Sequence, residues 1–263
     1  MPRTRACRAP RRARQGGRGQ MHSPGIELNG VGLHRAGAPV LRDISLHLTE
    51  HRIALVGRNG SGKSTLARLI KGLLRPDTGT IRTYGLNPAQ RTRAALSVAG
   101  FLFQNSDHQI LCPTVGEEIA FGPAEAGAPN PMAEARALMA AHGIAAWEDR
   151  AVSTLSEGQR RLVCLLAVLV MAPRVVLLDE PFAGLDIPTR LRLERFIATL
   201  PQQVILISHD PEMLMAQDRV IWLEAGAVAA DGPPGDVLPA FSAAMRAAAD
   251  ADAADEKPGP WLG

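Results

Sequence analysis

The chain has 263 residues, of which 46% are hydrophobic and 4% aromatic, and it carries a formal net charge of +3. This length and composition predict one large domain with an aliphatic core, or a domain with a subdomain. A membrane-spanning protein is excluded, because the longest apolar run, residues 162–172, is too short to cross a bilayer. A disulfide scaffold and a cysteine-ligated metal site are also excluded, because the three cysteines lack the spacing of either.

The basic charge is concentrated at the start of the chain. Residues 1–20 hold seven arginines and no acidic residue, whereas the remaining 22 basic residues are outnumbered by 26 acidic ones. Residues 1–23 are therefore predicted to form a disordered, Arg-rich tail. Three interpretations stay open for it: an arm that contacts anionic lipid or nucleic acid, a tail without function, or a translation start assigned upstream of Met21.

Residues 24–241 are predicted to form the folded domain, in which strands and helices follow one another. Residues 25–33 and 40–48 alternate between apolar and polar side chains, as strands with one buried face do. Further strands are predicted at 53–56, 80–84 and 98–103, with a helix at 66–71.

A helical subdomain is predicted at about residues 105–154, inserted into this domain. Thr114 and Glu117 have the spacing of a capping box, which marks the start of one helix. Residues 132–141 are helical by composition and are followed by a closing glycine. Residues 122–131, rich in proline and glycine, are predicted to be a loop between the two helices.

The second half of the chain predicts a parallel sheet covered by helices on both faces. A long apolar helix at 160–171 precedes two apolar runs, 175–178 and 204–207, which are typical of strands buried on both sides. A hairpin at 220–230 is predicted to close the sheet, and residues 242–263 are expected to be a C-terminal tail that begins as a frayed helix. The fold class is therefore α/β.

A glycine-rich segment joins the predicted strand at 53–56 to the helix that follows it. Residues 57–65 read Gly-Arg-Asn-Gly-Ser-Gly-Lys-Ser-Thr and match the phosphate-binding pattern G-x-x-x-x-G-K-[ST]. Its backbone N–H groups would surround a phosphate chain at the positive end of the helix. Lys63 would reach the β- and γ-phosphates, and Ser64 would bind Mg²⁺. The predicted ATP-binding residues are Gly57, Asn59, Gly60, Ser61, Gly62, Lys63, Ser64 and Thr65.

Polar side chains follow the predicted strands, where parallel sheets bind their ligands. Asp179 would hold Mg²⁺ with Ser64, and Glu180 would position and polarise an attacking water. His209 would contact the γ-phosphate and that water, and Gln104 would contact the metal or the water in one state and release it in another. The predicted catalytic residues are Glu180, His209 and Gln104, and the predicted metal ligands are Ser64, Gln104 and Asp179.

A second phosphate-seeking segment heads the long apolar helix. Residues 155–159 read Leu-Ser-Glu-Gly-Gln, in which Ser156 and Gly158 offer a hydroxyl, backbone N–H groups and a helix dipole. Because the chain already has a phosphate-binding loop, this segment is predicted to serve the nucleotide of a facing subunit. That arrangement implies a two-fold dimer with two ATPs in its interface. ATP binding would join the two subunits, and hydrolysis would release them.

Taken in this order, the motifs resemble those of ABC-type ATPases. The resemblance spans residues 26–241 and implies a P-loop (RecA-like) sheet core with an antiparallel β subdomain and an inserted helical subdomain. It implies ATP and Mg²⁺ as ligands. It also makes Ser156, Gly158 and Gln159 the signature that faces the partner's ATP, and Asp186 the D-loop aspartate.

Residues 103–110 and 114–122 resemble the ATPases of energy-coupling-factor importers, most closely those of biotin uptake, with cobalt and nickel uptake as the alternative. The resemblance implies a second ATPase subunit, a transmembrane coupling protein and a substrate-binding membrane protein. The coupling protein would dock between Gln104 and Ile110, with its arginine on Asp107, at the cytoplasmic face of the membrane. No nucleic-acid partner is expected. A soluble ABC ATPase that acts on DNA or ribosomes is disfavoured, because the sequence has neither long coiled coils nor a second P-loop.

Two positions depart from the family pattern. His34 and Arg35 stand where family members often stack an aromatic side chain on adenine, so the adenine contact is left open. The third signature residue is Glu157 rather than glycine. A carboxylate facing a triphosphate would repel it, so the Glu157 side chain is expected to point away.

Overall fold

The computed structural model describes residues 25–90 and 92–255. The predicted tail at residues 1–23 lies outside these ranges, as does the end of the chain from residue 256. None of the helices in the described ranges combines the length and the apolar content that a bilayer crossing needs.

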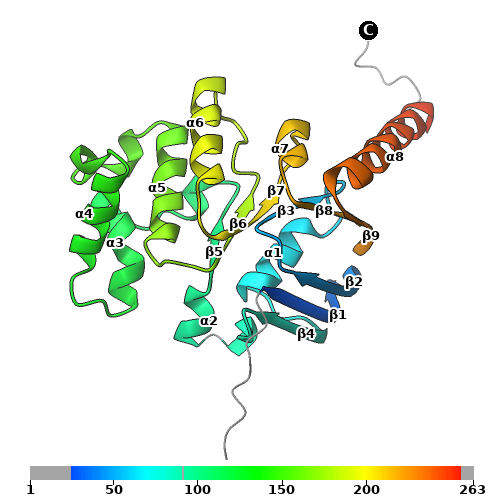
Figure 1. Ribbon diagram of the computed structural model, residues 1–263, viewed down its shortest axis with the longest axis horizontal. Helices are drawn as coiled ribbons and strands as arrows, with labels where there is room; N and C mark the ends of the chain where they lie inside the picture. Colours follow the sequence, from blue (N-terminus) through cyan, green and yellow to red (C-terminus); the bar gives the residue numbers. More distant parts are fainter. Residues whose placement is uncertain (1–24, 91, 256–263) are drawn as a thin grey trace, which may run out of the picture.

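A six-stranded sheet forms the centre of the molecule, in the order β5-β6-β7-β3-β8-β9 (Figure 1). Its first five strands are parallel, and β9 pairs antiparallel with β8. The middle strands are buried along almost their whole length because helices cover both faces of the sheet. The bounds are β3 Arg52–Val56, β5 Ala99–Leu102, β6 Val175–Asp179, β7 Gln203–Ile207, β8 Arg219–Glu224 and β9 Ala227–Gly232.

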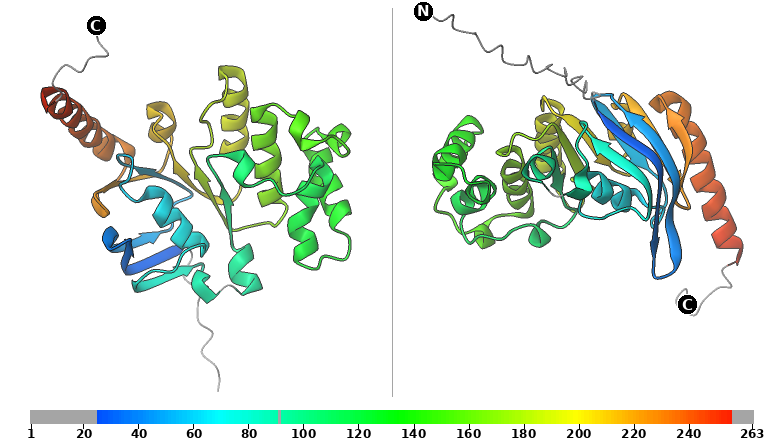
Figure 2. Two further views of the ribbon diagram at one scale, coloured as in Figure 1. Left: turned by 180° about the vertical axis from the view of Figure 1, so that it is seen from behind. Right: turned by 90° about the horizontal axis from the view of Figure 1, so that it is seen from below.

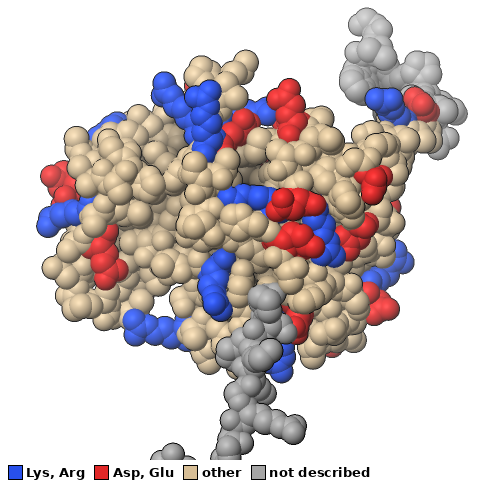
Figure 3. Space-filling view, in the orientation of Figure 1, with Lys and Arg blue, Asp and Glu red and all other residues tan. Residues whose placement is uncertain are grey.

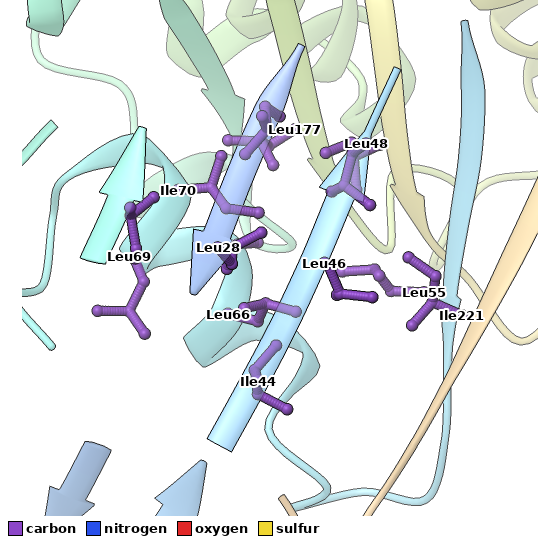
Figure 4. Close-up of a cluster of buried hydrophobic side chains, with 14 of the residues drawn as sticks. Leu28, Ile44, Leu46, Leu48, Leu55, Leu66, Leu69, Ile70, Leu177 and Ile221 are labelled. Carbon is purple, nitrogen blue, oxygen red and sulfur yellow. The ribbon is translucent and has the colours of Figure 1, made fainter. Parts of the chain in front are cut away.

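A second, antiparallel sheet has the order β2-β1-β4 and comprises β1 (Ile26–Arg35), β2 (Ala38–Leu48) and β4 (Thr78–Thr83). Helix α1 (Lys63–Lys71) packs between the two sheets. Figure 4 shows its apolar side chains between residues of both sheets, and all of these residues belong to one buried cluster. The parallel core and the antiparallel β subdomain predicted from the sequence are both confirmed.

Helices α5 (Glu157–Leu169) and α6 (Ile187–Ala198) cover the other face of the parallel sheet. Helices α3 (Val115–Glu125) and α4 (Pro131–Ala141) form a layer beyond α5, so they reach the sheet mainly through it (Figure 2). The predicted capping box of Thr114 and Glu117 begins α3. The 3₁₀ turns are Pro88–Gln90, Ser106–His108, Ala145–Trp147 and Val152–Thr154.

The loop predicted at residues 122–131 is wrong in its first part, because α3 continues to Glu125 with Pro123 inside it. An internal proline removes a hydrogen bond and crowds the preceding turn, at a cost of about 3 kcal/mol. Packing outweighs that cost here: a Cβ atom at Gly122 would lie only 2.8 Å from Met171 Sδ, so this turn touches the chain just after α5. The connection to α4 therefore covers only residues 126–130.

Helix α8 (Pro234–Asp255) extends away from the body of the molecule (Figure 1). Its first turns pack with α7 (Pro211–Met215) on β3 and β8. Residues 242–255, where a frayed helix was expected at the start of the tail, continue α8. The remaining short helix is α2 (Arg93–Ser97). Basic and acidic side chains are interspersed over the face seen in Figure 3.

Candidate active site

A cavity of about 960 Å³ opens at the carboxyl ends of β3, β6 and β7. It is lined by the loop before α1 and by Gln104, Asp179, Glu180 and His209. These residues come from four separate stretches of the chain. The parallel order of the strands brings them together, because the carboxyl ends of neighbouring parallel strands lie at one edge of a sheet.

The loop between β3 and α1 has a backbone that requires glycine. Gly57, Gly60 and Gly62 have φ angles of 147°, 82° and 104°, and a Cβ atom at Gly57 would lie 2.1 Å from the carbonyl oxygen of Leu223. Around Gly60 a Cβ atom would meet nothing within 4 Å, so the backbone is open on that side. At Gly60 and Gly62, which line the cavity, the loop therefore presents main chain without a side chain.

Lys63 supplies the loop with a buried positive charge, and Ser61 is buried beside it. The Lys63 Nζ donates to the carbonyl oxygens of Gly57 at 2.7 Å and Arg58 at 2.9 Å, and burial lowers the pKa of Lys63. The Ser61 Oγ is buried and has no hydrogen-bond partner among the described residues. A buried hydroxyl of this kind is costly, but Ser61 does not line the cavity. Its Oγ lies on the side of Gly57, where a Cβ atom would be 2.6 Å from it. The glycine-rich main chain of the loop and Lys63 fit a triphosphate.

Ser64 and Asp179 form an oxygen-rich pair beside the loop. The Ser64 Oγ donates to Asp179 Oδ1 at 3.0 Å, and the Asp179 residue is only 6% exposed. Burial raises the pKa of Asp179, so a cation at this carboxylate would favour its ionised form. A hydroxyl and a carboxylate are the ligands that Mg²⁺ prefers, and Gln104 lines the same cavity. The side chains present therefore fit a magnesium ion.

Glu180 directly follows β6 and has an unusual backbone for a residue with a side chain, since its φ angle is +48°. Its Oε1 lies 3.2 Å from the Nε2 of His209. Burial and the charge of Asp179 raise the pKa of Glu180 to about 7, whereas burial lowers the pKa of His209. A carboxyl group that titrates near neutral pH beside a neutral imidazole suits a general base.

Ser156, Gly158 and Gln159 lie apart from this cavity. They line a separate cavity of about 440 Å³, together with Thr189 of α6. Ser156 and Gln159 form a capping box at the start of α5, and a Cβ atom at Gly158 would lie 2.1 Å from Thr189 Cγ2. The glycine thus allows α5 and α6 to approach closely. That these residues serve the nucleotide of a facing subunit stays a prediction.

The side chain of Glu157 is turned back onto its own chain. Its carboxylate accepts hydrogen bonds from Arg160 at 2.7 Å, Arg161 at 2.9 Å and the Ser106 Oγ at 3.2 Å. These contacts neutralise the charge that would otherwise repel a triphosphate. The orientation agrees with the expectation that the carboxylate points away.

Asp186 caps α6, and its Oδ1 accepts a hydrogen bond from the backbone N–H of Thr189 at 2.8 Å. The Asp186 pKa is lowered by this interaction with Thr189. A capping aspartate positions the first turn of a helix. Its role as a D-loop residue stays a prediction.

Neither His34 nor Arg35 lines the cavity. The backbone N–H and the ring Nδ1 of His34 lie 2.6 Å and 3.3 Å from Asp77 Oδ2, so the imidazole faces this carboxylate. Arg35 is exposed beside it. Val40, which follows the turn, lines the cavity instead.

Two residues that support the site were missed by the sequence reasoning. Gln109 accepts from the backbone N–H of Phe103 at 3.2 Å and donates to the carbonyl of Cys164 at 3.1 Å, which ties the loop after β5 to α5. Arg161 is 2% exposed and donates to the carbonyl of Glu180 at 3.0 Å. The sequence does carry a signal for Arg161. Cys164 and Leu165 follow it at three and four residues and therefore share its helix face. A charged side chain on such an apolar face needs a buried partner.

Comparison with known proteins agrees with this geometry. The family model described as ABC transporter matches residues 41–183. The chain is 50% identical over 230 residues to the biotin transport ATP-binding protein BioM of Rhodobacter capsulatus, which covers 87% of this chain and 98% of that protein. It is 40% identical over 233 residues to the nickel import ATP-binding protein NikO of the same organism, covering 82% and 92%.

A solved structure is also similar. The structure of cbiO1 from Clostridium perfringens, described as part of the ABC transporter complex cbiONQ, matches with a TM-score of 0.71 at 26% identity. The match covers 81% of this chain and 90% of that chain. The predicted fold class is therefore found in a solved relative.

Proposed function

Because this chain belongs to the ABC transporter family, we propose that it is the ATP-hydrolysing subunit of an energy-coupling-factor importer that takes up biotin. The observation that carries the ATPase part is the single cavity that joins Lys63, Asp179, Glu180 and His209. The 50% identity to a biotin transport protein supports the substrate. The alternative is nickel or cobalt uptake, which the 40% identity to a nickel import protein favours.

The chemistry follows from the positions of the side chains. Lys63 and the backbone of the loop bind the triphosphate of ATP, and Ser64 and Asp179 would hold Mg²⁺. A bound Mg²⁺ neutralises charge on the phosphate oxygens. The oxygen of the attacking water bonds to the γ-phosphorus, and the bond between the γ-phosphorus and the bridging β-phosphate oxygen breaks. Glu180 accepts the proton that the water loses in this step. His209, whose Nε2 lies 3.2 Å from Glu180 Oε1, would contact the γ-phosphate and the attacking water.

The hydrolysis rate is expected to rise with pH through about 7. The pKa of Glu180 is raised to about 7, and a general base works only when it is ionised. Below that pH Glu180 holds a proton and cannot accept another. The expected rise is checked by measuring kcat/KM for ATP between about pH 5.5 and about pH 9. The pH profile of kcat/KM gives the pKa values of groups in the free enzyme. The same profile in the residual activity of Glu180→Gln would assign the titration to another group.

The proposed second ATPase subunit would complete each site. The cavity at Ser156 and Gly158 lies apart from the chain's own phosphate-binding loop, which supports a role toward the ATP of another subunit. A two-fold arrangement would place each start of α5 over the partner's loop. The second subunit is an identical copy or a related ATPase.

The proposed transmembrane coupling protein has a candidate docking groove. An apolar groove of about 680 Å³ lies between α2, β5 and the ends of α3 and α5, where Leu73 and Leu96 are 40% and 46% exposed. Gln109 lines the same groove, so the predicted docking segment between Gln104 and Ile110 borders it. A cytoplasmic segment of the coupling protein would bury these apolar side chains. This contact would hold the chain at the cytoplasmic face of the membrane, beside the substrate-binding membrane protein.

Removing the carboxylate of Asp107 is expected to weaken the complex. Asp107 keeps 70% of its side chain exposed and has Arg160 Nε at 3.7 Å, so the carboxylate remains accessible to an arginine of the coupling protein. Asp107→Ala should lower co-purification of the membrane proteins and biotin uptake several-fold. Asp149→Ala removes an exposed carboxylate elsewhere in the helical region and serves as the control. Assembly and uptake equal in both variants would exclude this contact.

The complex itself can be identified by purification. A tagged Glu180→Gln form is purified from native membranes, and the proteins and small molecules that accompany it are identified. Two membrane proteins with bound biotin are expected, and bound nickel or cobalt would support the alternative. A second ATPase in the preparation would indicate a heterodimer. Recovery from the soluble fraction with nucleic acid or ribosomes would overturn the importer.

A further inference from the structure

Glu180 is held in a conformation that its own side chain disfavours. A φ angle of +48° lies in the left-handed region, which residues with a Cβ atom rarely adopt. Such a conformation persists only where the surroundings determine it, and it is concentrated at functional sites. The backbone N–H of Glu180 donates to the carbonyl of Ile207, at the end of β7, at 3.0 Å. That bond fixes the peptide group before Glu180.

Arg161 fixes the peptide group that follows Glu180. The Arg161 Nη1 donates to the carbonyl oxygen of Glu180 at 3.0 Å, and the N–H of Ala183 reaches the same oxygen at 3.2 Å. The Arg161 side chain is almost completely buried. Because a buried guanidinium has few alternative positions, this contact restrains the direction in which the Glu180 side chain leaves the backbone.

The same guanidinium contacts the start of α5. The Arg161 Nη2 donates to Glu157 Oε1 at 2.9 Å, one helical turn earlier. Glu157 lies between Ser156 and Gly158, the residues predicted to face the ATP of a second subunit. A single planar group, with donors in fixed directions, therefore joins that segment to the backbone of the proposed general base.

We propose that Arg161 is a positioning residue for ATP hydrolysis, which holds the Glu180 backbone and couples it to Glu157 at the start of α5. This inference rests on the proposed function, in which Glu180 is the general base and the start of α5 binds the ATP of the second subunit. When that ATP moves the first turn of α5, Glu157 and Arg161 transmit the shift to Glu180. Each subunit's hydrolysis thereby depends on the ATP that it shares with its partner.

The test compares substitutions of two neighbouring arginines in the purified full-length chain. Arg161→Met should lower kcat tenfold or more and leave the KM for ATP within about twofold, because the residue acts on Glu180 and not on ATP binding. Arg161→Lys keeps the charge and one donor direction and should restore part of kcat. Arg160→Met is the matched control. Arg160 donates to the same Glu157 at 2.7 Å, but its Nη1 donates to the carbonyl of Leu155 at 3.0 Å and not to that of Glu180, so its kcat should stay within about twofold.

The outcomes separate this inference from the proposed function. If Arg161→Met folds and its kcat is unchanged, the inference is overturned. The proposed function still stands in that case, provided that Glu180→Gln loses hydrolysis. Hydrolysis that persists in Glu180→Gln overturns both. If Arg161→Met does not fold, Arg161→Lys and Glu157→Gln decide. A lowered kcat at constant KM in both supports the coupling, and full activity in both overturns it. In the Glu180→Gln background, Arg161→Met should cause no further loss, because both substitutions act on one group.

Discussion

Glu180→Gln is expected to lower kcat at least about a hundredfold and to leave ATP binding intact, since a positioned general base contributes about 10²- to 10⁴-fold. The amide has nearly the same shape but cannot accept the proton of the attacking water. It also removes a negative charge beside the triphosphate, so the affinity for ATP should stay the same or rise. Phosphate release and equilibrium ATP binding, measured on the same preparation, check both parts.

Glu224→Gln provides the control for Glu180→Gln. The charge of Glu224 raises the pKa of Lys63, as the charge of Glu180 does. Glu224 does not line the cavity, however, and its Oε2 accepts a hydrogen bond from the indole Nε1 of Trp222 at 3.1 Å. Its kcat should change by less than about threefold, as expected for a charge that does not touch the reacting atoms. Full activity of Glu180→Gln above pH 7 would show that another group accepts the proton.

Lys63→Met is expected to lower the affinity for ATP by about tenfold to a hundredfold. A hydrogen bond to a charged group contributes about 1.5–3 kcal/mol, and each 1.4 kcal/mol corresponds to about tenfold in affinity. The Lys63 Nζ donates to two loop carbonyls and stands at the phosphate-binding turn, so its loss removes the cation that the triphosphate would contact. Equilibrium binding of ATP measures the effect.

Lys71→Met is the matched control for this prediction. The Lys71 Nζ also donates to two backbone carbonyls, those of Leu96 and Ala99, each at 2.6 Å, and burial also lowers its pKa. It lies at the other end of α1, away from the cavity. Both variants should lose thermal stability, but only Lys63→Met should lose ATP binding. Equal affinities in the two variants would exclude Lys63 as the phosphate ligand.

Local patterns predicted much of this protein. The apolar runs that become β6 and β7, the glycine-rich turn before α1 and the capping box of α3 all depend on interactions within a few residues. Hydrophobic periodicity, positive φ angles at glycine and hydrogen bonds at helix ends act over such distances. For this reason the fold class and the residues at the strand ends could be inferred before any contact was known.

The tertiary structure decided the features that depend on packing between distant segments. Helix α3 runs through Pro123 because contacts around Gly122 outweigh the local penalty. The link from Glu157 through Arg161 to Glu180 exists because the first turns of α5 lie beside the residue that follows β6. Local pattern cannot show which buried partner a charge will meet, because that depends on how helices and strands approach one another. The sequence by itself determined which chemical groups this protein has at its strand ends. Only the packing of α5 on the sheet decided how those groups are held.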